Sequence, residues 1–484
     1  SDRAESGCAA SSMKPVGEIL WHWPQLCIAC GLAPTPGPDI RGICIDSRQV
    51  QAGDLFIALA GDPGPQFKSA SSGARDGHDF IPAAIEAGAS GLMVARHQAQ
   101  SIPQLQVADT LAGLWCLGRS GRQRMNGQVV GITGSSGKTT ARQWIEGLLE
   151  AQGQTHASIG SFNNHWGVPL SLARMPETSD FGVFEIGMNH PGEIQPLAEL
   201  VNMDVALVLN VLPAHLGYFD DIEGIRQEKL SICAGLKPDG SLVVLDTLPL
   251  DGVTAKHILR FGFSAAADVR GVPTYYADYT LVRVTVGERS WQYRLSAGGE
   301  HRVLTSLASF AVLLALGADL EAALDCMPTL LMPTGRGNEL VIGGISLLDD
   351  SYNANPVSMG YALQSLTNGD KNRQRVAILG EMLELGPASQ ALHEALQADC
   401  DGLDGVITVG DGFQSWNRSQ LGERFWGHVD SAADIDLNQL LEKLAPDAQI
   451  LVKGSNRVFW VHGFVEQLRR KLLEGSIVGD TGET

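Results

Sequence analysis

The chain contains no long apolar run and comparatively few basic residues. Its longest apolar stretch without a charged residue, 303–318, is shorter than the roughly 20 residues that cross a bilayer, so we expect a buried helix there and no integral membrane segment. Acidic side chains outnumber basic ones by 54 to 35, for a formal net charge of −19. A diffuse negative field repels polyanions, which argues against a nucleic-acid partner or an anionic membrane surface.

Cysteines are also few, and they form no disulfide framework. The eight are scattered along the chain, a distribution typical of reduced thiols, so we expect a cytoplasmic protein. Cys27 and Cys30 form a lone CxxC pair with no second pair at metal-site spacing. We interpret them as buried small residues rather than a zinc or redox site. Residues 1–12 lack the apolar centre of a signal peptide, and we expect a disordered leader.

The chain is rich in short apolar runs that alternate with helical stretches. With 484 residues it is too long for one hydrophobic core, since domains usually hold roughly 100–200 residues. The alternation predicts an α/β fold with helix-covered, mainly parallel sheets. We place three domains at 1–105, 106–332 and 333–484: a small α/β domain, a central P-loop ATPase-like domain and a C-terminal Rossmann-like domain.

Individual runs predict the main elements of these domains. Strands are expected at 54–59, 181–186, 205–209, 242–245, 376–379, 406–409 and 450–452. A helix is expected at 80–87, and 61–77, rich in Gly, Pro and Ser, should be a long surface loop. In open α/β sheets ligands gather at the carboxyl ends of strands, so polar residues directly after these runs are the candidates for a site.

The most specific motif is a glycine-rich turn between a strand and a helix. Residues 131–140 read GITGSSGKTT, follow the apolar pair Val129 and Val130, and precede a helical pattern. Glycines let consecutive N–H groups converge on an anion, and the helix start adds its positive dipole end. We call 131–140 the phosphate loop and predict that it binds phosphates through Gly134, Ser135, Ser136, Gly137, Lys138, Thr139 and Thr140.

Within the phosphate loop, two side chains have separate roles. Lys138 supplies a mobile positive charge, and the Thr139 hydroxyl is expected to meet magnesium. The strict Walker spacing would put a glycine at Ile132. An ordinary glycine-rich turn is the alternative, but the strand and helix signals agree better with a phosphate site.

Two further polar residues follow predicted strands. Glu185 lies near the end of 181–186, and His215 comes shortly after 205–209. A carboxylate and an imidazole beside a phosphate loop could hold magnesium against a nucleotide. Each also has an ordinary alternative, because a glutamate at a strand end is usually solvated and a single histidine more often fills a hydrogen-bonding role.

A second polar cluster lies near the start of the third domain. Residues 349–356 read DDSYNANP, shortly after Arg336. Two carboxylates and two amides in a tight loop could bind ribose hydroxyls. The alternative is a capped turn, because Asp, Ser and Asn favour such positions, and composition alone favours the turn.

The phosphate loop resembles that of the Mur ligase family, ATP-dependent enzymes that form amide bonds in peptidoglycan synthesis. The resemblance spans residues 40–456 and is strongest to members that join D-alanyl-D-alanine to UDP-N-acetylmuramoyl-tripeptide. It implies an ATP- and Mg2+-dependent ligase of cell-wall synthesis, and hence of cell shape and division, and we expect a monomer. Besides DDSYNANP, the segments that carry it are 46–48, 53–56, 76–80 and 189–193.

The resemblance also implies a role for each domain. The N-terminal domain would bind the UDP-sugar, with Ser47 and Arg48 near uridine and diphosphate. The C-terminal domain would close over ATP, with Arg336 near the γ-phosphate. The remaining implied contacts are Asn163 and Asn164 around the nucleotide and tripeptide, Asp350, Asn353 and Asn355 around ribose and phosphates, and Thr139, Glu185, His215 and Lys229 around magnesium.

The implied reaction runs through an acyl phosphate. The terminal carboxylate of the tripeptide would attack the γ-phosphate, and the amine of D-alanyl-D-alanine would then displace phosphate. Lys138 and Arg336 would neutralise repulsion between the carboxylate and the triphosphate. His215 and Asp350 are candidates for the base that deprotonates the amine.

Lys229 matches a lysine that is commonly carbamylated in this family. An ammonium beside magnesium ions would be repelled, whereas a carbamate is an anionic ligand. The alternative is a solvated helical lysine after Glu228.

Several positions depart from the family pattern. Arg302 and Thr305 stand where the family has asparagines that support adenine. Ser161 and the pair His165–Trp166 also differ from the usual residues, which predicts a difference in tripeptide preference. Two other functions therefore stay open: a related ligase that adds a single amino acid, and a catalytically weak paralogue that binds nucleotide and regulates cell-wall synthesis.

Overall fold

The computed structural model describes residues 18–60, 76–212, 219, 221–276, 279–296 and 299–479. The predicted leader, most of the 61–77 loop and His215 lie outside the described residues. By contacts the chain divides into two compact units, one of residues up to Val211 with Arg226–Leu330, the other of Leu212–Ile225 with Leu331 onward. The first unit holds two sheets and the second holds one. The predicted fold of three α/β domains is confirmed, while their boundaries stay predictions.

The first sheet contains four parallel strands in chain order. Successive strand residues point to opposite faces. Leu55 and Ile57 therefore pack with α1 (Trp23–Ala29), whereas Phe56 packs with α2 (Ile81–Glu86). The strand expected at 54–59 and the helix expected at 80–87 are both present, with shorter bounds. The strands are β1 (Gly42–Cys44), β2 (Asp54–Ile57), β3 (Gly91–Val94) and β4 (Gln104–Gln106).

The second sheet is larger and forms the centre of the first unit. Its strands are parallel from β6 to β11, and β12 is antiparallel to both of its neighbours, β11 and β13. The predicted mainly parallel sheet is therefore confirmed, and the antiparallel extension was not predicted. In spatial order its strands are β13 (Arg289–Ser296), β12 (Tyr279–Val286), β11 (Val269–Tyr275), β10 (His257–Gly262), β9 (Leu236–Leu245), β8 (Met203–Val208), β5 (Gln128–Thr133), β7 (Phe181–Glu185) and β6 (Thr155–Ala157).

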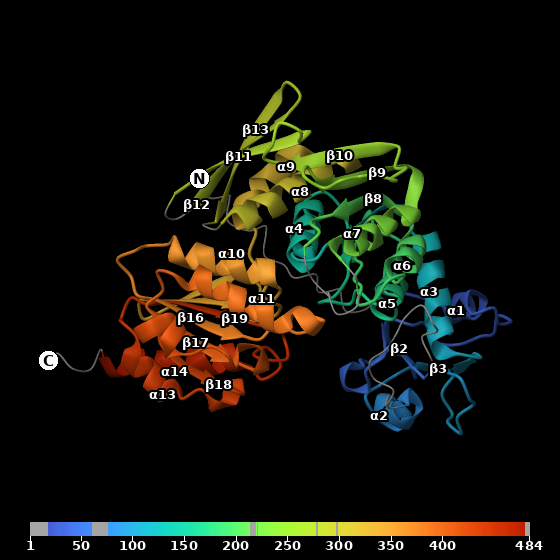
Figure 1. Ribbon diagram of the computed structural model, residues 1–484. Helices are drawn as coiled ribbons and strands as arrows, with labels where there is room; N and C mark the ends of the chain where they lie inside the picture. The colour runs from blue at the N-terminus through green and yellow to red at the C-terminus, as the bar shows by residue number, and fades with distance from the viewer. Residues whose placement is uncertain are drawn as a thin grey trace, which may run out of the picture. The chain divides into compact units, whose positions relative to one another are not determined.

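Helices cover both faces of this central sheet. On one face α4 (Lys138–Glu150) contacts α8 (Glu300–Leu316), which lies beside β9 and β10 in Figure 1. On the other face α3 (Thr110–Arg124), α5 (Gly167–Ala173) and α6 (Ile194–Val201) contact one another. The remaining helices are α7 (Ile222–Leu230) and α9 (Leu320–Cys326).

The buried helix expected at 303–318 is α8. Leu307, Phe310 and Leu313 along it are fully buried, because the helix packs on α4 as well as on the sheet. None of the helices within the described residues combines the length and apolarity needed to cross a membrane.

The first sheet is joined to the central one through α3 and α5. The Trp21 indole N–H donates to the Ala173 carbonyl at 2.8 Å, and Arg124 stacks over the Trp21 ring at 3.5 Å. A Cβ at Gly118 would lie 2.9 Å from the Pro169 backbone, so glycine there allows α3 and α5 to approach closely.

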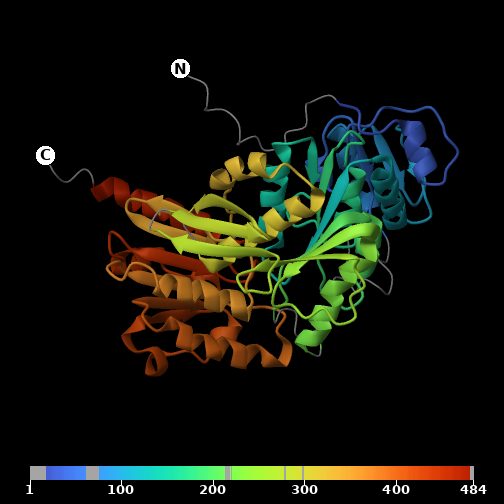
Figure 2. The same ribbon diagram turned by 90° about the horizontal axis from the view of Figure 1, so that it is seen from above.

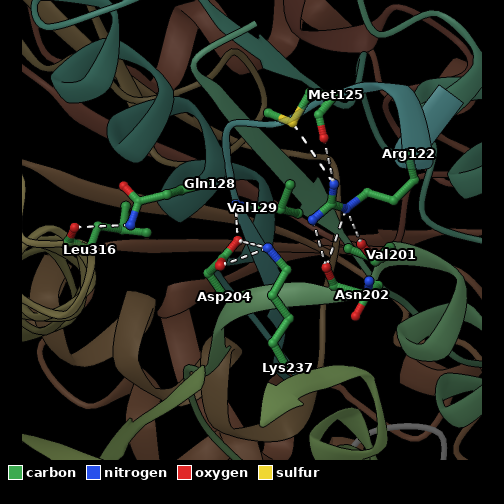
Figure 3. A network of polar contacts seen from close by, with 9 residues as sticks. All are labelled: Arg122, Met125, Gln128, Val129, Val201, Asn202, Asp204, Lys237 and Leu316. Atoms are coloured by element: carbon green, nitrogen blue, oxygen red, sulfur yellow. Dashed lines mark hydrogen bonds and ion pairs between the residues drawn. The ribbon is translucent and has the colours of Figure 1, made fainter. Parts of the chain in front are cut away.

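A network of polar contacts that includes the buried Arg122 lies where the central strands begin, and we call this side of the sheet the start edge (Figure 3). Arg122 of α3 donates to the carbonyls of Val201 and Asn202 at 2.9 Å each, at the end of α6. At the start of β8, Asp204 accepts from the Val129 N–H at 2.8 Å and from the Lys237 ammonium at 2.8 and 2.9 Å. The buried Arg122 and the partly exposed Asp204 and Lys237 therefore each have hydrogen-bond partners at the start edge.

The second unit contains a six-stranded sheet with helices on both sides (Figure 2). The strands expected at 376–379, 406–409 and 450–452 are present and parallel. In spatial order the strands are β14 (Asn338–Ile342, antiparallel to its neighbour), β15 (Ile345–Asp350), β19 (Gln449–Lys453), β16 (Arg375–Gly380), β17 (Gly405–Val409) and β18 (Phe425–Val429). The helices are α10 (Pro356–Thr367), α11 (Ser389–Ala395), α12 (Arg418–Leu421), α13 (Leu437–Lys443) and α14 (Phe464–Gly479).

Candidate active site

The phosphate loop joins the end of β5 to the start of α4, as its sequence predicts. Gly137 has φ +81°, a left-handed conformation that favours glycine. The Lys138 ammonium donates to the Gly134 carbonyl at 2.8 Å, so the side chain folds back over the loop. The helix start and the lysine are thus in place for an anion, and binding by the individual loop residues stays a prediction.

Asn210, which follows β8, supports the phosphate loop from the neighbouring strand. Its side-chain oxygen accepts from the Ser136 N–H at 3.0 Å, and its amide donates to the Ser136 carbonyl at 3.1 Å. The Asn210 carbonyl also accepts from the Ser135 N–H at 3.2 Å. This residue was not predicted as part of the site, although it follows a predicted strand just as Glu185 does.

Glu185 is fully buried at the end of β7, so the alternative of a solvated glutamate is wrong. One carboxylate oxygen, Oε2, accepts from the Thr139 hydroxyl at 3.1 Å, and the other, Oε1, accepts from the Arg142 Nε at 3.1 Å. Arg142 also donates to Glu146 Oε2 at 2.5 Å. The structure thus brings together the predicted pair Thr139 and Glu185, and adds two residues that were missed.

Lys229 is also fully buried, and its environment is electrostatically unfavourable to an ammonium. Burial, followed by the positive charge of Lys138, lowers the pKa of Lys229 well below its ordinary value, and Glu228 opposes the shift. The alternative of a solvated lysine is therefore wrong. Glu228 accepts from the N–H groups of Gly192 and Ile194 at 2.8 and 2.9 Å, which ties α7 to the segment 189–193.

The predicted substrate residues Asn163 and Asn164 lie in the same unit. The Asn163 carbonyl accepts from the Gly187 N–H at 2.8 Å, two residues after Glu185, so Asn163 lies close to this strand end. The Asn164 side chain accepts from the Gly167 N–H at 2.9 Å, which holds it against the backbone at the start of α5.

Ser47 and Arg48 lie in a short 3-10 helix after β1. Arg48 donates to both carboxylate oxygens of Asp46, at 2.9 and 2.7 Å. These hydrogen bonds lower the pKa of Asp46. The Arg48 side chain remains 86% exposed, so its guanidinium is accessible to a ligand.

In the second unit Arg336 lies in a turn just before β14. Its guanidinium stacks over the Tyr352 ring at 4.1 Å, and Trp460 packs edge-on against Tyr352 with ring centroids 5.3 Å apart. The buried Asp349 accepts from the Gly335 N–H at 3.1 Å, which joins this turn to the end of β15. Burial raises the pKa of Asp349, and its hydrogen bonds oppose that shift.

The DDSYNANP segment forms a capped turn, as its composition favours. Asn355 accepts from the Ser358 N–H at 2.9 Å and caps α10. Asp350 pairs with the buried Lys453 at 2.6 Å, and Lys453 also donates to the Asn353 carbonyl at 3.1 Å. Contacts of Asp350, Asn353 and Asn355 with a nucleotide stay predictions.

The donors around the phosphate loop fit magnesium in part. A threonine hydroxyl and a carboxylate 3.1 Å apart are hard oxygen ligands of the kind that Mg2+ prefers. The described residues contain no group of three or more His, Cys, Asp or Glu side chains that could hold a metal ion, and His215 lies outside them. Lys229 fits a metal site only as an anionic carbamate, because its ammonium would repel a metal cation.

Comparison with known proteins identifies the family. Residues 132–313 match the Mur ligase middle domain, and residues 336–456 match the Mur ligase glutamate ligase domain. The chain belongs to the Mur ligase family. Two Mur ligases, both named UDP-N-acetylmuramoyl-tripeptide–D-alanyl-D-alanine ligase, are similar over most of the chain. The Escherichia coli enzyme is 33% identical and covers 87% of this chain and 92% of its own length. The Bacillus subtilis enzyme is 32% identical and covers 77% of this chain and 80% of its own.

Solved structures of Mur ligases share the whole fold. A crystal structure of MurF from Acinetobacter baumannii is 29% identical, has a TM-score of 0.79 and covers 93% of this chain and 99% of its own. MurF ligase from Thermotoga maritima in complex with ADP is 27% identical, has a TM-score of 0.75 and covers 90% of this chain and 98% of its own. The predicted family and fold are therefore confirmed.

Proposed function

We propose that this Mur ligase joins D-alanyl-D-alanine to UDP-N-acetylmuramoyl-tripeptide, forming UDP-N-acetylmuramoyl-pentapeptide, ADP and phosphate. The names of its relatives support the substrates. The observation that carries the proposal is the arrangement at the phosphate loop, where Lys138 and Thr139 start a helix beside the buried carboxylate of Glu185. A cytoplasmic location and a monomeric state belong to the same proposal.

The proposed chemistry activates a carboxylate that would otherwise not react with an amine. The tripeptide carboxylate attacks the γ-phosphorus, and ADP leaves. The amine of D-alanyl-D-alanine then attacks the acyl carbon, phosphate leaves, and the amine loses a proton, for which His215 and Asp350 are the candidate acceptors. Lys138 and Arg336 reduce the repulsion between carboxylate and triphosphate.

Magnesium, when bound, would neutralise phosphate charge. Thr139 and Glu185 would hold it, together with His215 and a carbamylated Lys229. The proposed site has four further sets of contacts. They are phosphate contacts by the remaining loop residues, UDP-sugar contacts by Ser47 and Arg48, tripeptide contacts by Asn163 and Asn164, and ribose and phosphate contacts by Asp350, Asn353 and Asn355.

Carbamylation of Lys229 is part of this proposal. The unprotonated amine attacks the carbon of CO2, and a proton leaves, so an unprotonated lysine is a requirement. Burial and the charge of Lys138 lower the Lys229 pKa and so favour the unprotonated form. The resulting carbamate is an anion and would attract the Lys138 ammonium instead of repelling it. With 13C-labelled bicarbonate, a carbamate NMR signal is expected that Lys229→Met lacks. An identical signal in both proteins would contradict the assignment.

The first test is phosphate release from ATP and Mg2+ with UDP-N-acetylmuramoyl-tripeptide. We expect release that depends on D-alanyl-D-alanine and yields the pentapeptide, and its loss in Lys138→Ala. Release with single amino acids instead of the dipeptide would favour a related ligase. Nucleotide binding without turnover would favour the regulatory paralogue.

A further inference from the structure

Arg142 lies between two carboxylates one turn into α4. Its side chain is 5% exposed, its Nε donates to Glu185 Oε1 at 3.1 Å, and another guanidinium nitrogen donates to Glu146 Oε2 at 2.5 Å. Thr139, Arg142 and Glu146 follow helical spacing, so all three lie on one face of α4. That face is directed at the end of β7, where Glu185 lies.

The contacts distinguish the two oxygens of Glu185. Oε1 faces the guanidinium, and Oε2 faces the Thr139 hydroxyl at 3.1 Å. Because a guanidinium is planar and its donors have a fixed geometry, this contact restricts the rotation of the carboxylate. Glu146, whose side chain is 18% exposed, holds the arginine from its other side.

A purely structural ion pair would explain why a buried Glu185 needs a partner. It would not explain why the same carboxylate also receives the hydroxyl of a phosphate-loop residue. The arrangement leaves Oε2 directed toward the loop, next to the hydroxyl that a bound cation would share. Side chains that orient a metal ligand in this way commonly change metal affinity by about 10–100-fold when they are replaced.

We propose that Arg142, anchored by Glu146, is a positioning residue that turns Glu185 Oε2 toward Thr139 and thereby sets the affinity of the nucleotide site for its divalent cation. This inference rests on the proposed function, because it requires Thr139 and Glu185 to hold the cation. Arg142 itself touches the carboxylate and would touch neither cation nor substrate.

The test measures how strongly Mg2+ and nucleotide bind together, without turnover. The full-length protein is titrated calorimetrically with a non-hydrolysable ATP analogue, with and without Mg2+, and the ratio of the two dissociation constants gives the coupling. Arg142→Lys retains the charge but loses the planar fork, and we expect its coupling to fall about 10-fold. Glu146→Gln should lower the coupling by a smaller factor, and affinity without Mg2+ should stay unchanged in both variants.

Glu150→Gln, in the next turn of the same helix, is the matched control and should leave the coupling unchanged. If the wild type shows coupling and Arg142→Lys and Glu146→Gln retain all of it, Arg142 is only structural and the inference is overturned. If the wild type shows no coupling, the proposed metal site itself fails. Glu146 lies at the edge of the cluster, so Glu146→Gln keeps the test decisive even if replacement of Arg142 prevents folding.

Discussion

The charged side chains at the two edges of the central sheet differ in how they are paired. At the start edge, the Arg122 guanidinium donates to backbone carbonyls, and Asp204 pairs with Lys237. At the phosphate-loop edge, Lys229 is buried near Lys138, a charge of the same sign, with only partial compensation by Glu228. A buried charge that lacks a partner costs free energy. The contacts of the start edge therefore stabilise the fold, whereas at the phosphate-loop edge the surroundings of Lys229 disfavour its charged form, although Arg142 and Glu185 pair there.

The largest expected effect concerns activity at the phosphate-loop edge. Lys138→Ala should lower turnover about 100-fold or more, because one preorganised charge near the transferred phosphoryl group is lost. Its melting temperature should not fall, since the substitution removes a like-charge neighbour of Lys229. Phosphate release and thermal unfolding measure the two quantities. A lower melting temperature of Lys138→Ala would contradict the inference that Lys138 and Lys229 repel each other in the folded protein.

At the start edge, Arg122→Met should destabilise the fold by about 3 kcal/mol, because several buried carbonyls lose their donor. Urea unfolding would measure the loss. Turnover per folded molecule should stay near the wild-type value, since the network lies away from the phosphate loop. Arg122→Lys, which keeps one donor group, is the matched control and should lose less stability. If Arg122→Met is as stable as the wild type, the contacts of the start edge do not stabilise the fold in the way proposed here.

Lys229→Met should have opposite effects on stability and activity. In bicarbonate-free buffer at pH 7 we expect it to be about 1 kcal/mol more stable than the wild type, because burial of Lys229 on folding requires loss of its proton or a buried charge, and methionine requires neither. Turnover should be lost. A loss of stability would indicate that the amine has a structural partner.

The pH dependence of stability should also differ between Lys229→Met and the wild type. The Lys229 pKa is lowered in the folded protein, whereas an unfolded lysine keeps a value of about 10.4. Between the two values the unfolded chain binds more protons, so the Lys229 contribution makes stability rise with pH. Denaturant midpoints from pH 7 to 10 should rise less steeply in Lys229→Met than in the wild type. Parallel profiles would show that Lys229 does not titrate in this way.

The smallest effect is expected for Lys237→Met at the start edge. The Lys237 side chain is 34% exposed, so its pair with Asp204 is partly screened. We expect a loss of about 0.5 kcal/mol in urea unfolding and unchanged turnover. A loss as large as that of Arg122→Met would mean that the network acts as one unit.

Sequence reasoning predicted much of the fold because its signals are local. Apolar runs located strands of all three sheets, namely β2, β5, β7, β8, β9, β16, β17 and β19, whereas no predicted run covered β1, β3, β4, β6, β10–β15 or β18. Asn210 follows a predicted strand and could have been found by the rule that found Glu185. Arg142 and Glu146 share the helical spacing of Thr139, a signal that was present and not used. The capped turn at 349–356 was favoured by composition alone, and Asn355 does cap α10.

The order of residues by itself determined the strand, turn and helix of the phosphate loop, because glycines and a following helical pattern act over about ten residues. Only the tertiary structure decided the state of the charges beside it. The depressed pKa of Lys229 and the contacts of Glu185 with Thr139 and Arg142 depend on burial and on distances between elements far apart in the chain. Packing sets those distances, and no local pattern records them.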